Sequence, residues 1–180
     1  MKDNGKFIIM ENKKFASSDD RGSLHKIVLG ENINDFLVKE VVISKTISQY
    51  TARGLHLSLS PNDEAKIISC YEGSMLWVHI NIENIYHWNV NTTMLTSNDS
   101  KVLRTTKGNI HGCISLEDNT SLQIITDENY DDENTVYYEW GSILDKICLM
   151  HNIPLNLVNG QHYHDSLKIP ENTSIEIIRS

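Results

Sequence analysis

Apolar and polar residues alternate along most of this chain with the two-residue period of β-strands, and the longer period of helices is rare. In residues 75–82 the apolar side chains of Leu76, Val78, Ile80 and Ile82 fall on one face. Glu72-Gly73-Ser74 separates this segment from residues 65–71, so the two are expected to form a hairpin or a corner. The same pattern predicts further strands at Phe7–Met10, Leu37–Ser44, Lys101–Thr105, Ser121–Thr126, Thr135–Trp140 and Ser174–Ile178.

Only two segments, Glu31–Phe36 and Ser142–His151, have the pattern of short helices. Polar clusters rich in turn-forming residues, such as Asn91-Thr92-Thr93, separate the expected strands. Many short strands at close spacing are typical of a β-sandwich or barrel. The chain has no linker, repeat or low-complexity run. We therefore expect an all-β fold with a few short peripheral helices, in a single domain that spans residues 1–180.

Composition and charge exclude several classes of protein. The 180 residues carry 24 acids against 16 bases, a formal charge of −8, and a nucleic-acid binder would instead show a basic face. No apolar run approaches the roughly 20 residues of a membrane helix, and residues 7–10 are too short for a secretory core. The three cysteines form no Cys-x-x-Cys pair. These features predict a cytoplasmic protein with reduced thiols and no membrane partner.

The first stretch with candidate chemistry is Arg53-Gly54-Leu55-His56, followed ten residues later by Lys66. His56 and Ser58 alternate with two leucines, so they are expected to share one strand face. On the inward face of a small barrel, His56 would point into the cavity. It is either a catalytic base or an ordinary hydrogen-bonded histidine. Lys66 opens an apolar strand, an unusual place for an ammonium group unless it has a partner or a ligand.

The second stretch is Lys107-Gly108-Asn109-Ile110-His111-Gly112, where glycines flanking a histidine predict a tight turn. Taken alone, the pattern favours a structural role for His111 over a functional one. Together the two stretches resemble the two halves of a cupin-type jelly roll, in which a Gly-x-x-His turn closes the second motif. A metal-binding cupin needs a second histidine at position 58, where this chain has Ser58. His56 and His111 alone do not make a transition-metal site, so no metal is expected.

A wider set of motifs resembles the dTDP-4-dehydrorhamnose 3,5-epimerase family. The resemblance runs from about Asp20 to Trp140, and Arg-Gly-Leu-His followed by Ala-Lys is its most specific part. Members of this family are metal-free cupins that act on nucleotide-linked 4-keto-6-deoxy sugars. The motifs occur in the family's order and spacing, and they are Asp20-Arg21-Gly22, Arg53-Gly54-Leu55-His56, Ala65-Lys66, Glu72-Gly73, Gly108-x-x-His111-Gly112 and Tyr130.

The resemblance implies a role for each matching residue. His56 would be the base that removes a proton next to the ketone, and Tyr130 would be the acid that returns one. Lys66 would stabilise the enolate oxygen. Arg53 would position the sugar or the diphosphate, and His111 would line the pocket.

Three further residues are candidates for substrate binding. In the family the Asp-Arg-Gly segment crosses a dimer interface, so Arg21 would contact the diphosphate of the neighbour's ligand in a homodimer. Ser58 shares the expected strand face of His56. Asn81 stands on the strand where the family carries aspartates.

The chain departs from the family at several positions. Leu24 and Lys26 replace the aromatic residue and the glutamate that read the base, so a GDP- or CDP-linked sugar is as plausible as a dTDP-linked one. Trp77 and Asn81 replace the two aspartates of the strand. Ile169 replaces the aspartate that orients the catalytic histidine, and Asp165 is the nearby carboxylate that could take its place.

These observations favour a cofactor-independent isomerase that exchanges the proton at C3, at C5 or at both, in deoxysugar or surface-polysaccharide biosynthesis. One alternative is an isomerase of the same fold that moves the keto group between C4 and C3. Another is a sugar-nucleotide-binding cupin without catalysis, and the replacements at Ile169 and Asn81 support this alternative. The retained set of candidate catalytic residues favours the enzyme.

Overall fold

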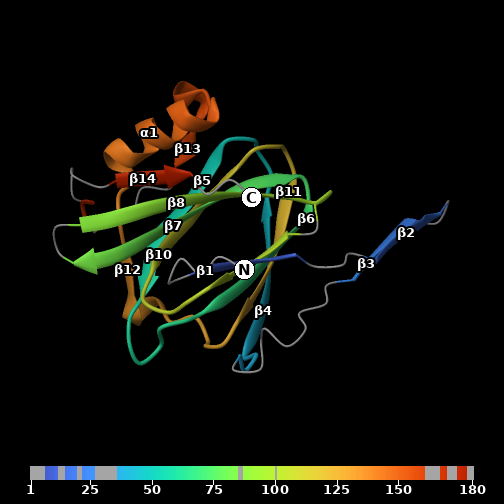
Figure 1. The fold of residues 1–180 in the computed structure, drawn as a ribbon, viewed down its shortest axis with the longest axis horizontal. Coiled ribbons are helices and arrows are strands. Elements are labelled where there is room, and N and C mark those ends of the chain that lie inside the picture. The colour runs from blue at the N-terminus through green and yellow to red at the C-terminus, as the bar shows by residue number, and fades with distance from the viewer. Residues whose placement is uncertain are drawn as a thin grey trace.

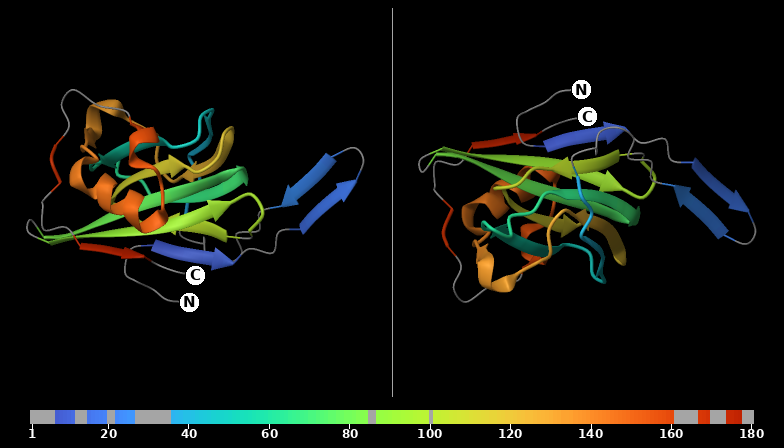
Figure 2. Two further views of the ribbon diagram at one scale, coloured as in Figure 1. Left: turned by 90° about the horizontal axis from the view of Figure 1, so that it is seen from above. Right: turned by 90° about the horizontal axis from the view of Figure 1, so that it is seen from below.

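A computed structural model describes residues 7–11, 15–19, 22–26, 36–84, 87–99, 101–160, 167–169 and 174–177. Two large sheets, almost entirely antiparallel, account for most of it, and a separate hairpin extends away from them (Figures 1 and 2). The expected all-β class with short peripheral helices is therefore confirmed. The strands are β1 (Phe7–Glu11), β2 (Phe15–Asp19), β3 (Gly22–Lys26), β4 (Glu40–Thr46), β5 (Thr51–Ser58), β6 (Lys66–Glu72), β7 (Ser74–Asn84), β8 (His87–Thr96), β9 (Lys101–Thr105), β10 (Ile110–Ser115), β11 (Thr120–Thr126), β12 (Thr135–Tyr137), β13 (Asn159–Gly160) and β14 (Ser174–Ile177).

The first sheet has the order β1-β9-β6-β11-β4, and the second has the order β12-β5-β10-β7-β8-β14, with β13 beside β5. The hairpin is formed by β2 and β3. In Figure 1, β4, β6 and β11 lie on the right and the second sheet lies on the left, together with the helix α1 (Gly141–His151). Two 3₁₀ turns, η2 (Asp132–Asn134) and η3 (Leu155–Leu157), complete the described elements.

Side chains of β7 show how the alternating pattern builds two layers of core. Leu76, Val78 and Ile80 pack with apolar residues of α1, whereas Met75 and Trp77 pack with residues of the first sheet. The central strand β10 is covered on both faces, so all of its residues are buried. Among the described residues, no helix is long and apolar enough to cross a membrane.

Two local expectations were wrong. Asn91-Thr92-Thr93 is not a turn but lies within β8, where it pairs with β7 over a long hairpin. Threonine suits a strand because its side chain is β-branched, and the hydroxyl of Thr92 is 2.9 Å from the His151 ring nitrogen Nε2. Likewise, only Gly108, with φ +73°, has the turn conformation, whereas His111 belongs to β10.

The two expected helices had different outcomes. The Ser142–His151 helix is confirmed as α1, which ends where Asn152 adopts a left-handed conformation with φ 55°. The expected helix at Glu31–Phe36 falls almost wholly on residues 31–35, outside the described residues. Phe36 itself is buried and belongs to no helix.

Candidate active site

A cavity of about 400 Å³ lies between the two sheets. The second sheet contributes strands β5 and β10 to its wall, and the first sheet contributes β4, β6 and β11. Five of the residues singled out from the sequence line this cavity. They are Arg53, His56, Lys66, His111 and Tyr130.

An irregularity in β5 brings two of these residues to the same wall. His111 of β10 is opposite His56, but the next residue, Gly112, is opposite Gly54, so Leu55 is an extra residue in β5. An extra residue reverses the alternation of side chains along a strand. Arg53 and His56 are three positions apart and would face opposite ways in a regular strand, yet both line the cavity.

The strand register also aligns a row of rings beside His56. On one side β10 places His111 opposite it, and on the other side β12 places Tyr137 opposite it. The ring centroids of His56 and His111 are 4.2 Å apart, and those of His56 and Tyr137 are 6.3 Å apart. The ring of Trp77 stacks on His111 at 5.6 Å.

Both histidines are held in their neutral form at neutral pH. Burial, together with the charge of Lys66, lowers the pKa of His56 to about 3. Burial also holds the pKa of His111 well below its usual range, with smaller contributions from His56 and Lys66. A neutral imidazole has a lone pair with which it can accept a proton.

Lys66 is buried at the start of β6, and its ammonium group has the partner that its position in the sequence required. This partner is the carboxylate of Glu64, whose Oε1 also accepts a hydrogen bond of 3.1 Å from the Ser58 hydroxyl. Burial lowers the pKa of Lys66, whereas the charge of Glu64 raises it. Glu64 was not predicted from the sequence. The pattern that could have identified it is an acidic residue two positions before a lysine that opens a buried strand.

Tyr130 lies at the cavity with its ring centroid 6.5 Å from that of His56. Its hydroxyl oxygen is 2.5 Å from that of Tyr137 and 2.9 Å from Asp132 Oδ1. Tyr137 also donates to Asp132 Oδ1 at 2.5 Å. Burial raises the pKa of Tyr130, whereas the hydrogen bond with Tyr137 lowers it. Tyr137 and Asp132 were not predicted from the sequence, because the register of β12 shows which way Tyr137 faces and only the folded chain brings Asp132 to both hydroxyls.

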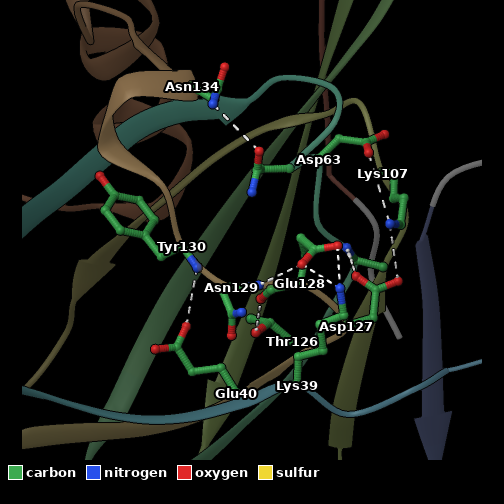
Figure 3. A network of polar contacts seen from close by, with 12 residues as sticks. Lys39, Glu40, Asp63, Lys107, Thr126, Asp127, Glu128, Asn129, Tyr130 and Asn134 are labelled. Carbon is green, nitrogen blue, oxygen red and sulfur yellow. Dashed lines mark hydrogen bonds and ion pairs between the residues drawn. The ribbon is translucent and has the colours of Figure 1, made fainter.

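Ionic contacts fix the loop that carries Tyr130 (Figure 3). Lys39 Nζ is 2.6 Å from Oε1 of Glu128, and Lys107 Nζ is 3.5 Å from Oδ2 of Asp127. The backbone N–H of Tyr130 donates to Glu40 Oε2 at 3.4 Å. The loop that begins at the end of β11 is thus tied to residues from other parts of the chain, which positions Tyr130 at the cavity mouth.

Of the remaining predicted residues, those that the structure describes do not line the cavity. Ser58 is buried against Glu64, and Asn81 lies on β7 opposite Asn89. Ile169 packs against the core cluster beside α1, so the position of the family's orienting aspartate is occupied by an apolar contact. Arg21 and Asp165 lie outside the described residues.

Comparisons with known proteins agree with this architecture. The family model described as dTDP-4-dehydrorhamnose 3,5-epimerase matches residues 5–148. Comparison with curated proteins found no match. The fold is similar to several solved structures, all at low sequence identity.

Three of these structures illustrate the similarity. A dTDP-4-dehydrorhamnose 3,5-epimerase from Bacillus anthracis with TDP and pyrophosphate bound has 20% identity and a TM-score of 0.65, covering 75% of this chain and 79% of that one. The Sulfolobus tokodaii epimerase has 22% identity and a TM-score of 0.64, covering 74% and 77%. A 3′-monoepimerase from Streptomyces bikiniensis in complex with dTDP-quinovose has 18% identity and a TM-score of 0.66, covering 88% and 80%.

The family model matches most of the chain, and the matched segment includes every described residue that lines the cavity. The chain therefore belongs to the dTDP-4-dehydrorhamnose 3,5-epimerase family and is an isomerase of the dTDP-sugar epimerase class.

Proposed function

We propose that this protein is a cofactor-independent epimerase of a nucleotide-linked 4-keto-6-deoxy sugar, which exchanges the proton at C3, at C5 or at both through an enolate. The observation that carries the proposal is the meeting of His56, Lys66 and Tyr130, from three separate segments, at one cavity. Epimerisation next to a ketone needs a base, an acid and a group that stabilises the enolate oxygen. These three residues supply one of each.

His56 is the base and removes the α-proton in its neutral form. The family's orienting carboxylate is absent at position 169, and a pKa of about 3 makes the free imidazole a weak base. A bound nucleotide diphosphate brings negative charge toward the pocket, and nearby negative charge raises the pKa of an imidazole. Substrate binding therefore raises the pKa of His56 and makes it a stronger base in the complex from which the α-proton is removed.

Lys66 stabilises the enolate oxygen that forms when the proton leaves. Its ammonium group is buried beside Glu64, and a fixed cation at low local dielectric stabilises developing negative charge far more than water does. The charge of the Glu64 carboxylate raises the pKa of Lys66 and so opposes the lowering caused by burial.

Tyr130 returns a proton to the carbon, and Tyr137 supports it. When Tyr130 gives up its proton, the Tyr137 hydroxyl turns its single proton from Asp132 to the phenolate that remains and stabilises it with a hydrogen bond. The anionic carboxylate of Asp132 acts in the opposite sense and favours the protonated form of both hydroxyls. Tyr137 is a positioning residue in this account.

The substrate is a dTDP-linked sugar in preference to a GDP- or CDP-linked one, because solved structures of similar fold hold TDP or dTDP-quinovose. Arg53 lines the cavity and positions the sugar or the diphosphate, and His111 lines the wall beside the base. The reaction belongs to deoxysugar or surface-polysaccharide biosynthesis in the cytoplasm.

The active form is a homodimer in which Arg21 contacts the partner's ligand. Arg21 falls in sequence between β2 and β3, and this hairpin extends away from the two large sheets of its own chain (Figure 2). A hairpin that extends away from the sheets of its own chain can reach the ligand in the cavity of a second copy.

Two substitutions test the catalytic assignment in D₂O with a dTDP-linked 4-keto-6-deoxy sugar. His56→Ala should abolish deuterium exchange while dTDP still binds by calorimetry. Tyr130→Phe should abolish the epimerised product with binding intact. Tyr71→Phe, a change on the half-exposed end of β6, is the control and should leave both unchanged. Exchange by His56→Ala near the wild-type rate would show that His56 is not the base.

A further inference from the structure

Three side chains at the cavity form a set of metal-ligand type. His56 comes from β5, Glu64 from the loop before β6, and His111 from β10, and one ligand atom of each lies within 4.8 Å of the other two. All three line the cavity. The sequence alone offered two of these donors, and the fold supplies the third.

The ring of His111 is oriented as a ligand would be. Its Nδ1 is 3.3 Å from the carbonyl oxygen of Asn109, which places the ring proton on Nδ1 and leaves the Nε2 lone pair available. Within the part of the chain that the structure describes, this buried Nε2 has no hydrogen-bond partner. A histidine with one nitrogen bonded to a carbonyl and the other unpaired is typical of metal ligation.

The turn that holds Asn109 is itself fixed. The Asn109 side-chain amide donates to the carbonyl oxygens of Thr106 and Lys107 at 3.0 and 2.9 Å, and to the Thr106 hydroxyl at 3.1 Å. The carbonyl that orients His111 therefore comes from a rigid segment, and the orientation of Nε2 is built into the fold.

We propose that the cavity binds one divalent transition-metal ion, such as Zn²⁺ or Co²⁺, through His56, Glu64 and His111. Two imidazoles and one carboxylate, with a position left open, are a common donor set for such ions. Metal–ligand bonds of about 2.0–2.2 Å in a tetrahedral arrangement place ligand atoms about 3.4 Å apart. The observed ligand atoms lie within 4.8 Å of one another, so metal binding requires them to approach by at most about 1.4 Å.

Lys66 competes with the metal for the same carboxylate. Its ammonium group pairs with Glu64 Oε1, so a metal ion must displace it or share the carboxylate with it. Removal of this positive charge should therefore strengthen metal binding. The metal and the sugar substrate also exclude each other, a consequence that rests on the proposed role of His56 as the base, whereas metal binding itself does not.

The test measures binding of Co²⁺ by its absorption spectrum, and of Zn²⁺ by competition, in tag-free protein freed of metal. Wild type should bind one ion per chain. Glu64→Gln should weaken binding by at least about 100-fold, more than the loss of an orienting partner costs. Asp63→Asn, an equal change of charge on the neighbouring residue, should stay within about twofold. Lys66→Met should bind about tenfold more tightly.

His56→Asn is a second ligand variant that guards against misfolding of Glu64→Gln, because His56 lines the cavity and the smaller polar side chain of asparagine fits the space that the imidazole leaves. It should also weaken binding by at least about 100-fold. Metal binding equal to wild type in both Glu64→Gln and His56→Asn would overturn the site, as would the absence of Co²⁺ binding in wild type.

Isotope exchange separates the two proposals. Zn²⁺ should inhibit deuterium exchange in wild type and Asp63→Asn at the concentration at which it binds. Failure to bind metal in an enzyme that exchanges deuterium overturns the metal site alone. Exchange that continues at full rate with metal bound contradicts the role of His56 and leaves the metal site standing.

Discussion

The lowered pKa of His56 leads to a quantitative prediction of how the free energy of unfolding depends on pH. The folded protein lowers this pKa from 6.5 to about 3, so the fold favours the neutral imidazole. As pH falls below 6.5, the unfolded chain takes up a proton at this residue before the folded chain does. The stabilisation from the neutral imidazole is therefore fully present above pH 6.5 and is lost as pH falls toward 3.

The size of the effect follows from proton linkage. Between pH 7 and pH 5, a group with an unfolded pKa of 6.5 and a folded pKa of about 3 lowers the free energy of unfolding by about 1.9 kcal/mol. His56→Asn removes this group and should reduce the loss of stability between the two pH values by that amount. The effect is a measurable share of the 5–15 kcal/mol typical of a folded domain.

Urea unfolding of both proteins at pH 5, 6 and 7, followed by tryptophan fluorescence and circular dichroism, measures the difference. The comparison is between pH dependences, so any change in stability that His56→Asn causes at all pH values cancels. His151→Asn removes a half-buried imidazole of α1 and should retain the contribution of His56. Identical pH dependence in wild type and His56→Asn would refute the reasoning.

Three other predictions concern the acid, the packing of the site and the assembly. Tyr137→Phe should lower kcat about tenfold with KM unchanged, and it should move the alkaline limb of the pH profile upward, because Tyr130 loses the hydrogen bond that lowers its pKa. A pH profile that does not move would contradict this support. Gly112→Ala should cost about 1–3 kcal/mol in urea unfolding, because its Cβ would lie 2.6 Å from a backbone carbonyl oxygen, whereas Gly160→Ala has open space and should cost less than about 0.5 kcal/mol. Arg21→Ala mixed with His56→Ala should regain part of the activity that each lacks, and no gain in mixed dimers would contradict the cross-subunit contact.

Much of the fold could be predicted from local pattern, because a two-residue period directly reports a half-buried strand. Lys101–Thr105 was predicted to the residue, and the strand faces of residues 75–82 were correct. The pattern failed at Asn91-Thr92-Thr93, where burial of threonine hydroxyls depends on partners in β7 and α1 that only the tertiary structure supplies.

The candidate site was predictable where one segment carried the signal, and not where the signal lay between segments. The cavity brings together His56, Lys66 and Tyr130, as the motifs led us to expect. Glu64 and Tyr137 were missed, because one lies in a loop and the other depends on strand register. The roles given to all of these residues remain predictions.

Exchange of solvent deuterium into the substrate tests the central claim most directly. The wild-type protein is incubated in D₂O with 4-keto-6-deoxy sugars linked to dTDP, GDP and CDP, and the products are read by NMR. Deuterium at C3, at C5 or at both in the dTDP-linked sugar is the result that the account predicts, and the labelled position identifies the site of epimerisation. No deuterium in any of the three sugars, from a protein that binds one of the nucleotides, would contradict it.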